Sequence, residues 1–264
     1  MIHIDGERLN ASLQELARIG ATDGGGVTRL TLSDEDKAAR DLLARWMTEA
    51  GLTVRIDDLG NMSGIRPGIE DAPPVYMGSH IDTVVRGGRY DGALGVMGAL
   101  EVIRTLNDHN VQTRLPVALV NWTNEEGVRF EPATLCSGAV AGAFTRDYAY
   151  GIRDRNGLIF GEELHRIGYR GDESLRPLPA SAYLELHIEQ GPVLESVGKP
   201  VGVVGGIVGI IWSEVVVTGQ SDHAGPSPMP LRKDALMAAS TMIASIERLA
   251  LDRDDVAVAT VGHA

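Results

Sequence analysis

The sequence predicts an α/β fold, because short apolar runs typical of strands alternate with longer segments of helical periodicity. The run Pro116–Trp122 is apolar almost throughout, as in a parallel strand buried on both faces. Leu94–Leu106 is apolar almost all round, which is typical of a helix packed beneath a sheet. Charged residues gather where the strands end, and ligand sites in open α/β sheets lie beyond the carboxyl ends of strands. We therefore expect the functional residues at one edge of a sheet.

The remaining elements follow from periodicity, turn residues and capping signals. Ser33 with Asp36 three residues later resembles a capping box, which starts the second helix, and Gly51 ends it. The turn 57–60 separates two short strands. The predicted elements are helices within 6–20 and at 34–50, strands at 53–56, 61–65 and 75–77, a helix at 94–106, a strand at 116–122, helices at 137–144 and 161–168, and a strand at 183–188.

The pattern changes from about Ile211, which predicts a second domain. Trp212–Thr218 alternates as a half-exposed strand, and a loop rich in Gly and Pro leads to a helix from Leu231 to about Leu251. A further strand is expected at 256–261. We therefore divide the chain into residues 1–209 and residues 210–264.

Composition and charge narrow the class of protein. The chain has 264 residues, 44% hydrophobic and 23% charged, as in a soluble globular protein. The net charge of −12 argues against nucleic acid or an anionic membrane as a partner. A single cysteine, Cys136, excludes an intrachain disulfide. Because no signal peptide or membrane span is visible, we expect a cytoplasmic protein.

The stretch Gly78–Gly95 holds the first candidate site residues. His80 and Asp82 are two residues apart, so on an extended strand end their side chains leave the same side of the backbone. Asp91 follows a Gly-Gly turn that can fold the chain back. An imidazole, a carboxylate that orients it and a second carboxylate are what a metal site at the end of a sheet requires.

Two further strand ends carry candidate ligands. Glu125 and Glu126 follow the apolar run that ends at Trp122, and His187 lies in the last strand of the first domain. Each of these signals alone is weak evidence for a metal site, because a lone histidine usually has a structural role and a pair of glutamates is usually solvated. Together with His80 and Asp91 they form a mixed nitrogen and oxygen set that suits zinc, manganese or cobalt. A second glutamate beside a ligand suits a general base.

Four motifs in order resemble the N-carbamoyl-L-amino acid hydrolases. These enzymes belong to the dinuclear-metal amidohydrolase and aminoacylase superfamily, together with allantoate amidohydrolases and β-ureidopropionases. The resemblance runs from about Leu42 to the C-terminus. The motifs are G-S-H-I-D-T-V with G-G-R-Y-D-G, then N-E-E-G-V-R-F, H-I-E-Q-G-P-V-L-E and T-G-Q-S-D-H-A-G-P-S-P-M-P.

The resemblance implies two divalent metal ions, zinc or manganese with cobalt as a further option. Asp91 would bridge them, His80 and Glu126 would complete opposite sides, and His187 would be a ligand of the metal next to His80. Glu125 would be the general base.

It also implies roles around the ligands. Asp82 would orient His80. Gln190 and His223 resemble substrate-contacting positions, and His223 would belong to a lid domain that also forms a homodimer interface.

The family's fold is a mixed, mostly parallel sheet flanked by helices, as in zinc peptidases, with a smaller α+β lid domain. Residues 1–209 would be the metal-binding catalytic portion and 210–264 the first half of the lid. Members are considerably longer, so the lid is expected to be truncated and a last metal-binding histidine to be missing.

The implied reaction is hydrolysis of the carbamoyl C–N bond of an N-carbamoyl-L-amino acid, which releases the amino acid, ammonia and carbon dioxide. An allantoate amidohydrolase or other ureido-acid hydrolase is the alternative within the enzyme class. A non-catalytic fragment that binds metal or dimerises is the alternative of another class.

Overall fold

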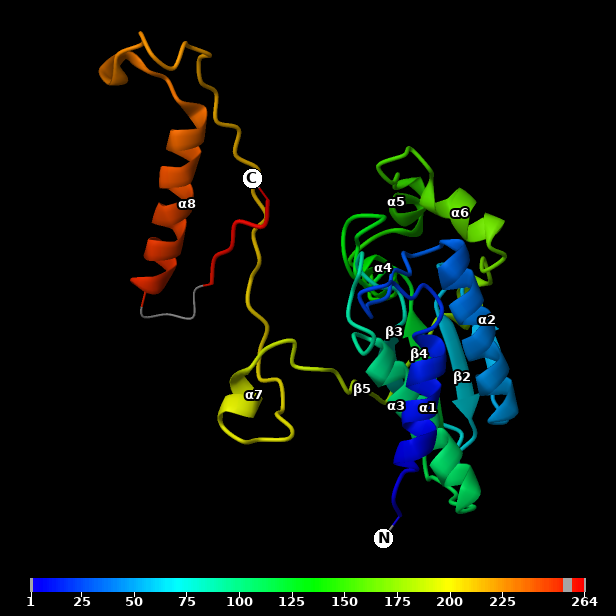
Figure 1. Cartoon of the computed structure of the whole chain (residues 1–264). Helices are drawn as coiled ribbons and strands as arrows, with labels where there is room; N and C mark the ends of the chain where they lie inside the picture. The colour runs from blue at the N-terminus through cyan, green and yellow to red at the C-terminus, as the bar shows by residue number, and fades with distance from the viewer. Residues whose placement is uncertain (1, 254–257, 264) are drawn as a thin grey trace. The chain divides into compact units, whose positions relative to one another are not determined.

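A mixed five-stranded sheet carries the first part of the chain (Figure 1). The computed structural model describes residues 2–253 and 258–263. The strands lie in the order β1-β2-β4-β3-β5. β3 runs parallel to β4 and β5, whereas β2 is antiparallel to β1 and β4. The bounds are β1 (Thr53–Ile56), β2 (Met62–Arg66), β3 (Val75–His80), β4 (Val117–Trp122) and β5 (Ala182–Leu184).

Helices flank this sheet, so the predicted α/β class is confirmed. The parallel strands β3 and β4 are joined through α3, which packs on both of them, and α1 packs on α3. The Ser33 hydroxyl accepts the N–H of Asp36, as the capping signal predicts. The helices of this part are α1 (Gly6–Leu16), α2 (Asp34–Glu49), α3 (Ala93–Asp108), α4 (Leu135–Val140), α5 (Arg146–Gly151), α6 (Phe160–Arg166) and α7 (Val193–Ser196), with a 3-10 turn at Glu173–Leu175.

The hydrophobic core fixes which face of each strand is inside. Leu119 of β4 belongs to the main cluster, together with residues of α1, α2 and α3. Its neighbours Ala118 and Val120 point to the other face of the sheet, where they pack with Tyr76. Both faces of β4 are therefore covered, which explains why its sequence is apolar without alternation.

The chain divides into two compact units, Met1–Pro200 and Val201–Ala264. The second unit holds helix α8 (Ala235–Leu251) and a 3-10 turn at Met229–Leu231. The strand expected at Trp212–Thr218 was wrong, because these residues form no strand. Within the described residues they pair with no other strand, and Trp212 is 93% exposed. The boundary expected at residues 209 and 210 stays a prediction.

Other predicted elements differ at their ends. α8 begins at Ala235 with Asp234 as its cap, four residues after the expected start at Leu231. The strand expected at 183–188 ends at Leu184, so His187 lies in a loop beyond it. Of the strand expected at 256–261, residues 256 and 257 lie outside the described part, and 258–261 form no strand. Within the described residues, no helix is both long and apolar enough to cross a membrane.

Candidate metal centre

His80 is the last residue of β3 and its side chain is 2% exposed. Its Nδ1 lies 2.9 Å from the main-chain carbonyl oxygen of Asp82. A carbonyl oxygen can only accept, so Nδ1 carries the proton and the Nε2 lone pair faces Glu125. Nε2 lies 3.4 Å from Glu125 Oε2. The strand end and this one hydrogen bond therefore set both the direction and the tautomer of His80.

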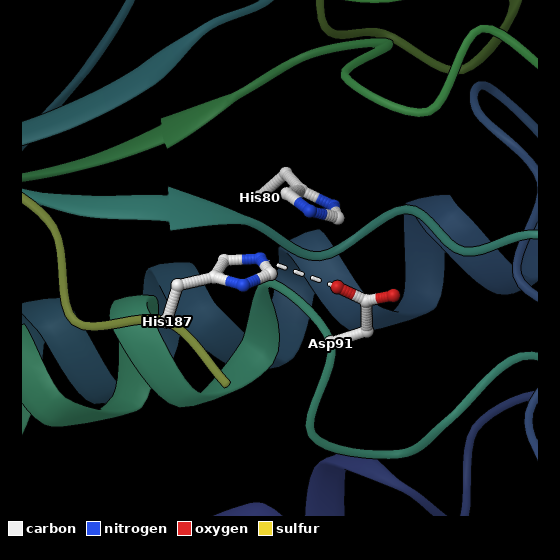
Figure 2. A group of neighbouring side chains, drawn as sticks. All are labelled: His80, Asp91 and His187. Atoms are coloured by element: carbon white, nitrogen blue, oxygen red, sulfur yellow. Dashed lines mark ion pairs between the residues drawn. The ribbon is translucent and has the colours of Figure 1, made fainter. Parts of the chain in front are cut away.

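Asp91 and His187 lie beside His80 (Figure 2). His187 Nδ1 is 2.8 Å from the carbonyl oxygen of Ile188, which fixes the same tautomer as in His80. Its Nε2 points at Asp91 and lies 3.2 Å from Oδ1. Gln190 donates from Nε2 to the other oxygen of Asp91, Oδ2, at 2.6 Å. One ligand atom each of His80, Asp91 and His187 lies within 4.8 Å of the others.

The turn after β4 brings the two glutamates to this edge of the sheet. Asn124 adopts φ +58°, a left-handed conformation that asparagine tolerates better than most residues. Its side-chain amide donates to the carbonyl of Phe130 at 2.6 Å. The carbonyl of Glu125 accepts the N–H of Thr134 at 2.7 Å. The chain therefore reverses sharply after the strand and holds Glu125 and Glu126 in one place.

Asp82 links the turn to His80. Its carboxylate is 1% exposed and accepts the N–H groups of Glu125 and Glu126, each at 3.3 Å. Thr31 donates its hydroxyl to the same carboxylate at 2.7 Å. The carboxylate atom nearest His80 Nδ1 is 3.8 Å away, so the main-chain carbonyl of Asp82 orients the imidazole. The side chain of Asp82 holds the glutamate turn.

The electrostatics of the site favour a cation. Burial raises the pKa of Glu125, and burial with the nearby carboxylates raises the pKa of Glu126 to about 7. Burial acts to lower the pKa of His80, but the carboxylates of Asp82 and Glu125 outweigh it and the pKa is raised. Glu125 and Glu126 therefore lie in surroundings that disfavour their negative charge.

The donor set fits a divalent metal ion. The Nε2 lone pairs of His80 and His187 each face a carboxylate oxygen, which is repulsive unless a proton or a cation lies between them. Glu126 Oε1 is buried with no hydrogen-bond partner among the described residues. Neutral imidazole nitrogens and carboxylate oxygens are ligands that zinc and manganese accept.

The structure brings together most of the residues predicted for the site. His80, Asp91 and His187 converge, Glu125 lies against His80, and Asp82 supports them. Glu126 is not among the three clustered ligands of the described residues. The roles predicted for all of these residues stay predictions.

One predicted residue, His223, lies in the second unit, and one residue that contacts the site, Thr31, was not predicted. His223 belongs to the second unit, where it lines a hollow with Asp222 and Arg232. Thr31, which holds Asp82, was missed, because a threonine in a loop carries no signal in one sequence.

Comparison with known proteins places the chain in a family. Residues 76–262 match the model of peptidase family M20/M25/M40. The chain belongs to this family. It is 45% identical over 261 residues to an N-carbamoyl-L-amino-acid amidohydrolase of Rhizobium meliloti, which covers 98% of this chain and 63% of that protein. This relative confirms the resemblance to the N-carbamoyl-L-amino acid hydrolases that the four motifs indicate.

Two further relatives extend the comparison. Allantoate deiminase 1 of Glycine max is 38% identical over 248 residues, 90% of this chain and 51% of that protein. A crystal structure of an amidase of the hydantoinase/carbamoylase family from Burkholderia multivorans is 49% identical, with a TM-score of 0.80 over 96% of this chain and 62% of that one. This M20/M25/M40 chain therefore spans less than two thirds of the length of each of these relatives.

Proposed function

We propose that this chain forms the metal-binding part of an amidohydrolase that cleaves the carbamoyl C–N bond of N-carbamoyl-L-amino acids. The observation that carries the proposal is the placement of Glu125 3.4 Å from His80 Nε2, at the edge of the group formed by His80, Asp91 and His187. A carboxylate beside a metal-ligand cluster is the arrangement that metal-assisted hydrolysis requires. The Rhizobium meliloti relative supports the substrate class.

His80, Asp91, Glu126 and His187 would hold two divalent ions, zinc, manganese or cobalt. Asp91 would be the bridge between them, as the resemblance to the N-carbamoyl-L-amino acid hydrolases implies. Its Oδ1 faces His187, and its Oδ2 accepts a hydrogen bond from Gln190. Bound divalent cations supply Lewis acidity, which polarises a carbonyl group and lowers the pKa of water.

Glu125 is the proposed general base and acid. It takes a proton from the attacking water and passes that proton to the leaving nitrogen. In the site without metal, burial raises the pKa of Glu125. Asp82 keeps Glu125 in place through the main-chain N–H that its carboxylate accepts.

Two residues are proposed to contact substrate. Gln190 is bonded to Asp91, so its amide lies at the site and can meet a ureido or carboxylate group. His223 is proposed as a donor to the oxyanion that forms at the carbamoyl carbon, a role worth about 3–4 kcal/mol for one donor. The products are the free amino acid, ammonia and carbon dioxide.

The assembly that we propose is a cytoplasmic homodimer that forms through the proposed lid domain, residues 210–264. Helix α8 has no buried residue, and Leu236 and Leu249 are 76% and 66% exposed. Large exposed apolar surfaces mark interaction sites. Light scattering of the purified chain tests the dimer, which a monomeric mass would refute.

Hydrolysis of allantoate or another ureido acid is the second candidate, which the Glycine max relative favours. Ammonia release from N-carbamoyl-L-methionine and from allantoate, measured with manganese or zinc present, separates the two. Turnover of neither substrate refutes both assignments. The alternative of a non-catalytic fragment is tested by the metal content of the purified chain. Two tightly bound metal ions per chain would argue against a fragment that only dimerises.

The substitution Glu125→Gln tests the role of the base. We expect it to keep the metal content and to lower kcat by at least about 100-fold, the usual contribution of a positioned base. Glu126→Gln is the matched control and should lose metal. The opposite pattern would show that the two glutamates have exchanged roles.

A further inference from the structure

A short segment near the N-terminus, residues 27–31, lies along the loop that follows His80. Val27 and Gly87 exchange two main-chain hydrogen bonds, at 2.9 and 2.8 Å. The N–H of Thr83 donates to the carbonyl of Arg29 at 2.9 Å, and the N–H of Arg29 donates to the Thr83 hydroxyl at 2.8 Å. The segment and the loop therefore pair as two extended strands do, without forming a regular sheet.

Arg29 locks this pairing from inside the protein. Its side chain is 1% exposed, and Nε donates to the carbonyl of Ile81 at 2.6 Å. Its NH1 donates to the carbonyls of Leu16 and Ile19 at the end of α1. A buried guanidinium with these partners leaves the main chain between His80 and Asp82 little freedom to move.

Thr31 is the residue of this segment that reaches the site. It is 3% exposed, and its hydroxyl donates to Asp82 Oδ2 at 2.7 Å. The carbonyl of Thr31 accepts from Arg129 NH1 at 3.0 Å, which holds the backbone of Thr31 in place. The hydroxyl therefore presents a fixed donor to the Asp82 carboxylate.

The other bonds of that carboxylate are longer. The N–H groups of Glu125 and Glu126 lie 3.3 Å from Oδ1 and Oδ2, beyond the usual 2.7–3.2 Å of an N–H to oxygen bond. The hydroxyl bond at 2.7 Å has the ordinary length for its type. Of these three hydrogen bonds to the Asp82 carboxylate, the one from Thr31 is therefore the shortest.

We propose that Thr31 is a positioning residue of the metal centre: its hydroxyl orients the Asp82 carboxylate, which sets the place of the Glu125–Glu126 turn relative to His80. Part of this inference rests on the proposed function, because the turn matters for chemistry only where a metal binds. Groups that orient metal ligands at one remove typically change metal affinity or activity by 10- to 100-fold.

Thr31→Val removes the hydroxyl and keeps the shape, and Thr31→Ser restores the hydroxyl. Thr105→Val is the matched control, because Thr105 is a buried threonine whose hydroxyl donates to a buried carboxylate, that of Glu101, at 3.1 Å. Glu101 pairs with Arg8 and not with the metal ligands. Both valine variants lose one buried hydrogen bond, so a purely structural effect lowers the melting temperature in both.

The first measurement needs no metal. Amide hydrogen exchange at Glu125 and Glu126 should become about 10-fold faster in Thr31→Val, as expected for the loss of one hydrogen bond, and stay at the wild-type rate in Thr31→Ser and Thr105→Val. Unchanged exchange at both amides in Thr31→Val would overturn the inference.

The second measurement is the affinity for manganese or zinc, by titration calorimetry. Thr31→Val should weaken binding about 10- to 100-fold, whereas Thr31→Ser and Thr105→Val should bind as the wild type does. Equal affinities in all four proteins would mean that Thr31 is only structural. Faster exchange in Thr31→Val, found together with a wild-type chain that binds no metal, would support the positioning and refute the proposed function, so the two failures are distinguishable.

Discussion

Replacing Gly92 by alanine should remove His80 from the metal centre. Gly92 precedes α3 and has φ +60°, and a Cβ built on it would lie 2.4 Å from Nε2 of His80 and 2.5 Å from two carbons of the same ring. The atom it approaches is the nitrogen that faces Glu125. Any side chain at residue 92 therefore competes with the imidazole for the same space.

The size of the effect follows from these distances. Ordinary contact begins near 3.4 Å, so the ring has to retreat by about 1 Å. Distances between a metal and its ligands vary by only about 0.2 Å, and a ring displaced by five times as much cannot act as a ligand. The ring cannot rotate away without losing the hydrogen bond between its Nδ1 and the main-chain carbonyl of Asp82. We expect metal affinity to fall at least about 100-fold.

Calorimetric titration with manganese or zinc measures this change, and Gly142→Ala supplies the control. Gly142 has φ +83°, and nothing lies within 4 Å of a Cβ built there. Both alanines carry backbone strain on the order of 1–3 kcal/mol, but only the one at residue 92 meets the imidazole. Equal metal affinity in the two folded variants would refute the placement of His80.

Two further predictions concern a buried ion pair and a buried thiol. Arg40→Met should lower the free energy of unfolding by about 3–5 kcal/mol, because it leaves the buried Asp36 carboxylate without its ion pair. Lys37→Met is the control: it breaks only an exposed pair with Asp41, so it should lower the free energy of unfolding by less than about 1 kcal/mol. Urea denaturation measures both, and similar losses would contradict the difference in burial. The thiol of Cys136 is fully buried and burial raises its pKa, so a disulfide reagent should label it only as fast as the chain unfolds; rapid labelling of the folded chain would show that the thiol is accessible.

The convergence of the candidate residues was predictable from their positions at strand ends. His80, Glu125 and His187 each follow or end an apolar run, and parallel strands bring their carboxyl ends to one edge. β5 is parallel to β3, so His187 reaches Asp91 although it lies beyond its strand. The alternation of strands and helices was sufficient for the α/β class, because each element buries a face of the sheet.

Other features depend on contacts that periodicity does not encode. The strand expected at Trp212–Thr218 has the right alternation, but a strand needs a partner, and the described part of the second unit offers none. The hydrogen bond from the Thr31 hydroxyl to Asp82 joins two residues that are 51 positions apart in the sequence. Gly92 could be read from the sequence as a turn residue, but its closeness to the His80 ring depends on how β3 and α3 pack.

Anomalous diffraction from crystals grown with manganese or zinc tests the central claim most directly. Data collected on both sides of the metal's absorption edge locate the ion without reference to activity. The account predicts a peak bounded by Nε2 of His80, the carboxylate of Asp91 and Nε2 of His187. A fully occupied metal elsewhere in the chain, with none among these three residues, would contradict it.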